Sequence, residues 1–473
     1  VLALFVLGVP IVFGTHPKIF GDGDVSWHIA AGQWMIEHRQ IPMVDPFSFS
    51  AFGKPWIAHE WLSEILMAAA FSVTGYTGLA VLVAASLSLT FLIVGRRLAR
   101  WARPVELCAA LMVAALVLYP FILARPMVFV WPILAWWTDQ LLRAREENRL
   151  PTWWLVPMMV LWVNLHASFA LGIGLVGVFA LEALVESKER LQTLLRWSVF
   201  GLATTAAALF NPHGVSGLLL PLTVFSSKTV HIIREFNPTD FTTMPMFEVA
   251  LMLLIGISLW RGVRLHPVRL ILVLGMLHLA LAHIRHQTLF MIIATMVAVP
   301  PMTTAWMEKR EFKEELLKNL TGSPSRGRLA GWAVAAVIAL TLCARFLWPV
   351  APAESDVNAT TAFAHIPTEF RNTPVLNEYS FGGPLILRGI KVFMDGRTDV
   401  YGDSHFLQYL AISRGDRVAF AKADRQWRFC WAIFPPDNKA IIALFDQSPD
   451  WRRIYSDKFA IIHVRPGCAG SPR

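Results

Sequence analysis

Long hydrophobic runs separated by short polar loops make up most of residues 1–350. A helix needs about 20 apolar residues to cross roughly 30 Å of hydrocarbon, and on this basis about eleven spanning helices are expected. The expected spans are Val1–Gly14, Leu62–Val94, Val105–Leu123, Met127–Leu142, Trp153–Leu165, Phe169–Leu184, Leu194–Phe210, Phe247–Trp260, Leu270–Ala282, Thr288–Val299 and Leu329–Trp348. The first run is short and no small-residue cleavage pattern follows it, so we expect upstream residues rather than a cleaved signal peptide. The pattern predicts an α-helical polytopic membrane domain over residues 1–350.

The pattern changes after Pro349, where the hydrophobic runs shorten to the length of strands. Strands are expected at Thr373–Tyr379, Lys391–Arg397, Phe429–Phe434 and Phe459–Arg465, and helices at His405–Gly415 and Asn438–Asp446. About 120 residues are enough for a separate hydrophobic core. Residues 351–473 are therefore expected to form a small soluble α/β domain.

Two segments of this domain, Ser380–Leu387 and Met394–Asp403, are dense in glycine and charge. The simpler interpretation, which we favour, is a strand-end turn in which Asp395 and Arg397 form an ion pair. The alternative is a turn that faces the membrane domain and helps to bind an acceptor or a glycan. Cys430 and Cys468 belong to the same domain, and the sequence leaves open whether they form a disulfide.

The composition supports a membrane protein, and in a membrane protein a positive net charge indicates how the chain is oriented. Hydrophobic residues make up 55% of the chain and charged residues only 16%, which excludes an ordinary soluble protein of this length. The formal charge of +9 comes largely from loops that alternate with less charged ones. The cationic loops are Arg96–Arg103, Arg143–Arg149, Lys188–Arg196, Arg261–Arg269 and Glu308–Arg328. Such loops face the cytoplasm and contact anionic lipids, so the charge gives no support to nucleic-acid binding.

The opposite set of loops then lies on the outer face, together with the tail after Pro349. The first of these loops, residues 15–62, contains Asp22 and Asp24 followed by His28, with several tryptophans around them. Two carboxylates so close together can supply a general base or ligands for a hard cation such as Mg²⁺ or Mn²⁺. Tryptophan side chains suit the bilayer interface. The loop is therefore predicted to be a catalytic loop at a membrane surface.

Other polar residues also gather at the outer ends of the expected helices. Ionisable groups near hydrocarbon are costly unless they pair or face a wet cavity, so a cluster of them indicates a functional site. The alternative for each residue is a helix cap or a lipid-headgroup contact. The further candidates are His59, Glu60, Asn164, His166, Asn211 and His213 for substrate binding, and Arg125, Arg285, His283 and His286 for an anionic group.

Several motifs resemble those of the GT-C superfamily of polytopic glycosyltransferases. They are the acidic pair, Ile41–Pro42, Lys54–Trp56 and Glu60–Leu66. Further along, a group of bacterial membrane proteins that resemble this superfamily is matched by Ala124–Pro126, Trp162–Gly172, Phe210–Gly214 and His283–Gln287. The likeness is strongest over about the first hundred residues. Two features depart from the superfamily's lipid-A and protein-mannosyl members: the acids are spaced Asp-Gly-Asp instead of being adjacent, and His28 is added.

The resemblance implies a GT-C-like fold, with the catalytic acid at Asp22 or Asp24 and a sugar donor linked to polyprenyl phosphate. It also implies a bacterial inner-membrane enzyme that acts on a glycan, lipid or protein acceptor, with its outer domain over the acceptor side. Chemistry independently favours Asp24 as the base, because Trp27 and nearby apolar residues would raise its pKa and a charged Asp22 would raise it further. The alternative is that Asp24 caps the following helix.

The arginines are candidates for the leaving phosphate, since guanidinium groups bind phosphate oxygens in pairs. Arg125 precedes Pro126 at a helix start, where backbone N–H groups also favour anions. The alternative for each arginine is a contact with a lipid headgroup. A second class of function is a transporter or flippase of a lipid-linked or small polar substrate. Transporters place ionisable groups near the bilayer midplane and often contain inverted repeats, and neither is evident here.

Overall fold

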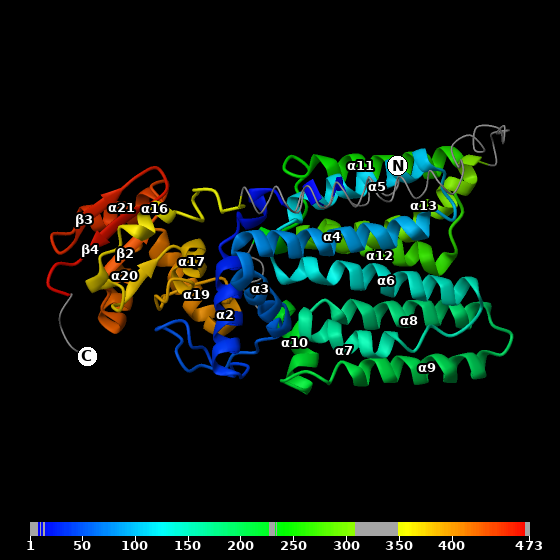
Figure 1. Cartoon of the computed structure of the whole chain (residues 1–473), viewed down its shortest axis with the longest axis horizontal. Coiled ribbons are helices and arrows are strands. Elements are labelled where there is room, and N and C mark those ends of the chain that lie inside the picture. The colour runs from blue at the N-terminus through cyan, green and yellow to red at the C-terminus, as the bar shows by residue number, and fades with distance from the viewer. Residues whose placement is uncertain are drawn as a thin grey trace.

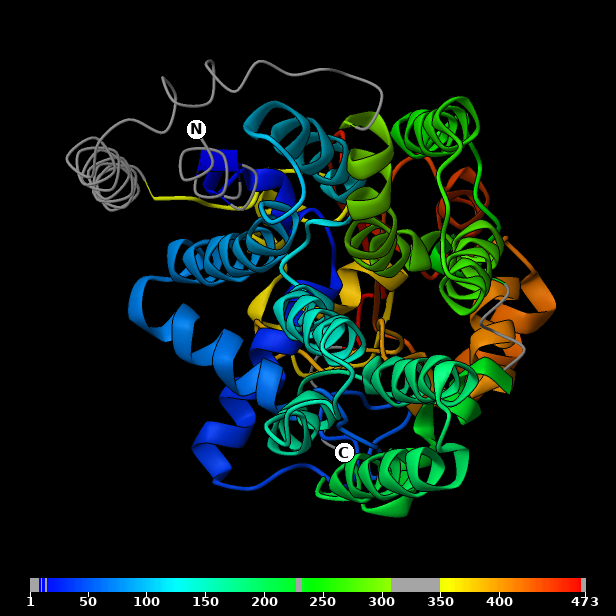
Figure 2. The same ribbon diagram turned by 90° about the vertical axis from the view of Figure 1, so that its right-hand side faces the viewer.

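The computed structural model describes residues 8–9, 11–12, 15–226, 232, 234–307 and 349–468. The protein is mostly helical, with a small mixed sheet near the C-terminus. The molecule is elongated (Figure 1). Long helices lie side by side in one part of it, the first or helical half (residues 15–307). The sheet with its short helices lies beyond α2 in the other part, the C-terminal half (residues 349–468). Figure 2, turned by 90°, shows most of the long helices nearly end-on.

The helices of the first half have sharper boundaries than the hydrophobic runs. They are α2 (Asp24–His38), α3 (Trp61–Thr74), α4 (Tyr76–Leu98), α5 (Pro104–Leu118), α6 (Pro126–Glu146), α7 (Leu155–Leu165), α8 (Phe169–Glu186), α9 (Arg190–Ala207), α10 (Val215–Ser226), α11 (Pro245–Arg261), α12 (Pro267–Ala282) and α13 (Gln287–Met307). Short 3-10 turns η4 (Arg234–Phe236) and η5 (Ile284–His286) join some of them. Proline occupies the first position of α5, α6, α11 and α12, where its missing N–H costs no helical hydrogen bond.

Four helices of the described residues are long and apolar enough to cross a membrane. They are Tyr76–Leu98, Pro104–Phe121, Phe169–Glu186 and Ile284–Trp306, while α3, α7 and α12 are apolar but shorter. A membrane protein is therefore supported, but the expected number of about eleven spans is not confirmed. The expected span Leu62–Val94 is in fact two helices, because Gly75 breaks it at a φ of 63°. Leu329–Trp348 and most of Val1–Gly14 lie outside the described residues.

The C-terminal sheet has the strand order β1-β2-β4-β3. The strands are β1 (Val375–Asn377), β2 (Trp431–Phe434), β3 (Arg452–Ser456) and β4 (Ile461–Val464). The helices are α16 (Thr360–Ala364), α17 (Gly382–Ile386), α18 (Thr398–Tyr401), α19 (Asp403–Ser413), α20 (Arg417–Trp427) and α21 (Lys439–Asp446). β1 pairs parallel to β2, and the other two pairings are antiparallel. Three expected strands and both expected helices overlap observed elements, whereas β3 and α20 were not predicted.

The strand expected at Lys391–Arg397 was wrong. Its backbone is held by other partners: the Asn377 side chain bonds to Phe393 and Met394, and the Val392 N–H donates to the Phe47 carbonyl. The segment therefore joins the C-terminal half to the 15–62 loop instead of extending the sheet. Cys430 and Cys468 form a disulfide between β2 and the end of the described chain.

Candidate active-site cavity

A cavity of about 860 Å³ lies where the helices of the first half meet the C-terminal half. Nine of the residues selected from the sequence line it: Asp22, Asp24, His28, His59, Glu60, Arg125, His166, Arg285 and His286. Four others, Asn164, Asn211, His213 and His283, are not among its lining residues. Asn164 accepts from Trp61 Nε1 at 2.7 Å, and Asn211 bonds within its own turn, so both have structural contacts instead. The His283 ring contacts the Phe236 carbonyl.

The two aspartates have different local roles. Asp22 Oδ1 accepts from the Asp24 backbone N–H at 2.9 Å, so Asp22 holds the turn that starts α2. Asp24 is the first residue of that helix and makes no capping hydrogen bond. Its Oδ1 instead accepts from Trp27 Nε1 at 3.0 Å. Asp22 therefore accepts a backbone hydrogen bond at the start of α2, and the Asp24 carboxylate contacts side chains of the cavity.

Arg125 joins three carboxylates, two at the start of α2 and one in η4. Its Nη1 is 3.1 Å from Asp22 Oδ2 and its Nη2 is 2.8 Å from Asp24 Oδ2, and Nη1 also pairs with Glu235 of η4. One guanidinium cannot neutralise three carboxylates, so this group carries excess negative charge when all are ionised. Arg125 also lies between the Asp22 and Asp24 oxygens that the sequence suggested as ligands for Mg²⁺ or Mn²⁺. It therefore positions the acids, and both its Nη atoms already contact carboxylates.

The pKa of Asp24 reflects this crowding. Burial raises it from 3.8 to about 7; Arg125 and the Trp27 hydrogen bond oppose the rise, whereas Asp22 and Glu235 add to it. A carboxyl that titrates near neutral pH has substantial populations of both forms, as a general base requires. Close to it, burial and the charge of Asp24 raise the pKa of the Tyr379 hydroxyl well above its usual range, so Tyr379 stays neutral.

Arg285 has a different environment from Arg125. Its guanidinium lies 4.5 Å from the centre of the Phe236 ring, a cation–π contact at the cavity wall. Within the described ranges, no carboxylate is at ion-pair distance from Arg285. An arginine that lines a cavity without such a partner can bind an incoming anion.

His28, which the sequence suggested as a catalytic residue, is buried against glutamates. Its Nδ1 is 3.1 Å from Glu64 Oε1, and its Nε2 is 3.8 Å from Glu60 Oε2. Among the described residues, these three form one of two groups whose atoms are close enough to hold a metal ion. The other group, Glu182, Glu186 and His266, does not line the cavity. Asp22 and Asp24 belong to neither group. Glu64 was missed in the sequence because it lies inside an apolar helix.

The C-terminal half closes the cavity through two glycines. A Cβ on Gly383 would come within 2.0 Å of the Gly23 carbonyl oxygen, and one on Gly396 within 1.8 Å of Asp24 Oδ1. A Cβ at position 383 would collide with backbone, and one at position 396 would displace the Asp24 carboxylate or the loop, so both close contacts favour glycine. The segment Met394–Asp403 therefore reaches the acidic pair directly. The glycine density of this segment was the signal, although the sequence slightly favoured a simple turn.

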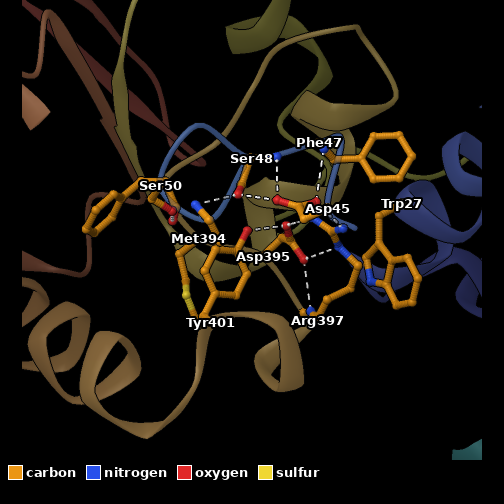
Figure 3. Close-up of polar contacts among 12 residues, drawn as sticks. Trp27, Asp45, Phe47, Ser48, Ser50, Met394, Asp395, Arg397 and Tyr401 are labelled. Carbon is orange, nitrogen blue, oxygen red and sulfur yellow. Dashed lines mark hydrogen bonds and ion pairs between the residues drawn. The ribbon is translucent and has the colours of Figure 1, made fainter. Parts of the chain in front are cut away.

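An ion-pair network fixes this segment (Figure 3). Arg397 Nη2 is 2.7 Å from Asp395 Oδ2, as the sequence suggested, and its Nη1 is 2.6 Å from Asp45 Oδ1 in the 15–62 loop. Tyr401 donates to the same Asp395 at 2.5 Å. Arg397 is also part of the cavity wall. The turn that contains the Asp395–Arg397 ion pair is therefore also the turn that faces the cavity. The expected pair is present and lies at the site.

Comparison with known proteins adds no further assignment. No protein-family model matches the chain, and no curated protein matches it either. The interpretation of the cavity therefore rests on its own geometry and charges.

Proposed function

We propose that the protein is a membrane glycosyltransferase of the GT-C type, which transfers a sugar from a polyprenyl-phosphate donor to a glycan, lipid or protein acceptor. One observation carries the proposal: a single cavity contains a carboxyl with a pKa of about 7, Asp24, and an arginine without a described ion-pair partner, Arg285. Sugar transfer from a phosphate ester needs these two functions, a base for the acceptor and a cation for the leaving group.

In the proposed reaction the Asp24 carboxylate removes the proton from an acceptor hydroxyl. The hydroxyl oxygen forms a bond to the anomeric carbon of the donor while the bond from that carbon to the phosphate oxygen breaks. The electron pair leaves with polyprenyl phosphate, and Arg285 stabilises its added negative charge. A single displacement of this kind inverts the configuration at the anomeric carbon.

The cavity wall also suits a sugar and a lipid phosphate. Trp27, Trp56 and Tyr379 contribute aromatic surface near Asp24, and Leu171, Met276 and Leu289 contribute apolar surface from the helices. Binding sites for small molecules are commonly lined by such surfaces with a few polar groups that fix orientation. The proposal therefore places the sugar near α2 and the lipid chain toward the helical half.

The proposed location is the bacterial inner membrane, with the cavity and the C-terminal half on the outer side. The loop charges support this orientation. The Cys430–Cys468 disulfide supports it as well, because such bonds persist in oxidising compartments.

The test is sugar transfer by the purified full chain in proteoliposomes. Polyprenyl-phosphate donors carrying different radiolabelled sugars are supplied with a panel of membrane glycans and lipids. The proposal expects label in an acceptor and free polyprenyl phosphate as the second product. Movement of intact donor across the bilayer without cleavage would instead support the transporter or flippase alternative.

A further inference from the structure

Histidine and glutamate side chains form a cluster on the cavity wall that the proposed transfer reaction does not use. His28 of α2 lies between Glu60 and Glu64, which stand at the start of α3. One potential ligand atom from each of the three residues lies within 4.8 Å of the other two. All three residues line the cavity.

Glu64 has an unsatisfied oxygen in this cluster. The side chains of His28 and Glu64 are each only 1% exposed, and Glu64 Oε2 has no hydrogen-bond partner among the described residues. Protonation does not solve this, because Oε2 would then be either an acceptor without a donor or a donor without an acceptor. Leaving a buried polar group unpaired costs about 1–3 kcal/mol, and more for a charged one. A bound cation would satisfy it.

His28 Nδ1 is within hydrogen-bond distance of Glu64, at 3.1 Å, but the distances from histidine nitrogens to Glu60 are longer than hydrogen bonds. His28 Nε2 is 3.8 Å and His166 Nε2 is 3.4 Å from the Glu60 carboxylate, both longer than an ordinary N–H···O hydrogen bond. Two ligands of one tetrahedral zinc ion lie roughly 3.3 Å apart, because the bonds to the metal are about 2.0 Å long. His59 Nε2, at 3.7 Å from Glu60, extends the same arrangement.

We propose that His28, Glu60 and Glu64 bind a divalent transition-metal ion of the zinc class, with His166 beside Glu60 as the fourth protein ligand. Imidazole and carboxylate together suit such ions, whereas Mg²⁺ prefers oxygen ligands alone. This site differs from the pair Asp22 and Asp24, whose oxygens contact Arg125. An ion here would face the same cavity as Asp24. The proposal does not depend on sugar transfer, because metal binding is measurable without any substrate.

The first experiment measures metal content on the full chain, purified in detergent and stripped with a chelator. Zn²⁺ is titrated back and counted by elemental analysis after gel filtration, and Co²⁺ is used as a spectroscopic probe. We expect one equivalent of tightly bound Zn²⁺ and a Co²⁺ visible spectrum typical of four or five nitrogen and oxygen ligands. A chain that retains no stoichiometric Zn²⁺ and gives only the spectrum of aqueous Co²⁺ would overturn the proposal.

Variants then locate the ion. Glu64→Gln and Glu60→Gln keep the side-chain size and should weaken Zn²⁺ binding roughly a hundredfold or more, with a smaller loss for His166→Ala. His266→Ala is the matched control, because it disrupts the second cluster of described residues, Glu182, Glu186 and His266, and should leave binding unchanged. Loss in His266→Ala with full retention in both glutamate variants would overturn the assignment. Unchanged Co²⁺ spectra in the glutamate variants would do the same.

Discussion

The helical half of the molecule has charged clusters at both ends, built from the same residue types but paired to different degrees. At the cavity end, three carboxylates share Arg125, and Glu64 keeps one oxygen without a described partner. At the other end of α6 and α8, roughly 30 Å away along the helices, Arg269 forms a two-point contact with Glu182 at 2.9 and 2.7 Å. Arg145 pairs there with Glu186.

This contrast separates structural charges from charges available for chemistry. An arginine and a carboxylate that satisfy each other contribute to packing and offer little to a ligand. Excess acids around one arginine raise a pKa, and an unpaired arginine attracts an anion. The cavity end has both features, so substitutions there should change turnover, whereas substitutions at the other end should change stability.

The largest effect is expected for Asp24→Asn. It removes the proposed base, and turnover should fall roughly a hundredfold or more, the usual scale for loss of a general base. The start of α2 should be preserved, because Asp22 and not the Asp24 side chain accepts the hydrogen bond there, while the ion pair between Asp24 and Arg125 is lost. Initial rates of radiolabelled transfer, normalised to folded protein by gel filtration, measure the effect. Near-normal transfer by this variant would remove Asp24 from the mechanism.

Arg285 provides the next test, since it is the cation without a described carboxylate partner. Arg285→Ala should lower turnover about a hundredfold, comparable to the loss of one preorganised donor at a developing charge. Arg285→Lys keeps the charge but loses the planar fork, so it should mainly raise the KM for the donor, by about tenfold. A lipid-headgroup contact would tolerate lysine. Equal kinetics for the lysine variant and the wild type would therefore contradict the phosphate role.

The sequence allowed much of this site to be expected and missed some of it for identifiable reasons. The loop charges predicted that Asp24, Arg125 and Arg285 lie at the outer-face ends of their helices. The structure brings all three to one cavity. The pattern did not show that Arg125 would be saturated by carboxylates, because Glu235 is distant in the chain. Glu64 was missed because hydrophobic neighbours made its segment appear to be a simple membrane span.

The fold, too, could be predicted from the sequence only in part. Helical segments followed from hydrophobic runs, but the break at Gly75 depends on a single backbone angle that no run reveals. The segment Lys391–Arg397 has the composition of a strand, yet side-chain and loop contacts hold it away from the sheet. At Lys391–Arg397, tertiary contacts therefore decide between local alternatives.

Gly396→Ala tests the contact between the two halves. The added Cβ would lie 1.8 Å from Asp24 Oδ1, so the carboxylate or the loop must move. A displacement of about 1 Å at a catalytic group can cost up to a hundredfold in rate, and we expect a loss of roughly tenfold to a hundredfold. Gly174→Ala is the matched control, because a Cβ there meets nothing within 4 Å. If the two variants have equal rates, the contact does not position Asp24.

The pH dependence of kcat/KM gives a smaller, diagnostic effect. Asp24 must be ionised to act as a base, and its pKa of about 7 means that kcat/KM should fall as the pH drops below 7. Glu235 raises this pKa and Arg125 lowers it, with Asp22 and the Trp27 hydrogen bond as the other nearby influences. Glu235→Gln removes a negative neighbour, so the profile should move to lower pH. A profile that is flat below pH 7, or that moves to higher pH in this variant, would contradict the assignment.

The smallest effect on turnover is expected at the opposite end of the helices, with Arg269→Ala. Glu182 is 1% exposed, and Arg269 makes two hydrogen bonds to it, while Arg145 is farther away at 3.6 Å. Removing one partner of a buried pair leaves the other charge uncompensated and typically costs about 3–5 kcal/mol, part of which Arg145 should offset. Thermal unfolding in detergent should therefore show a lower Tm, whereas turnover per folded molecule should equal that of the wild type. A loss of turnover with unchanged Tm would reverse the contrast between the two ends, because it would assign chemistry to the cluster whose charges are already paired.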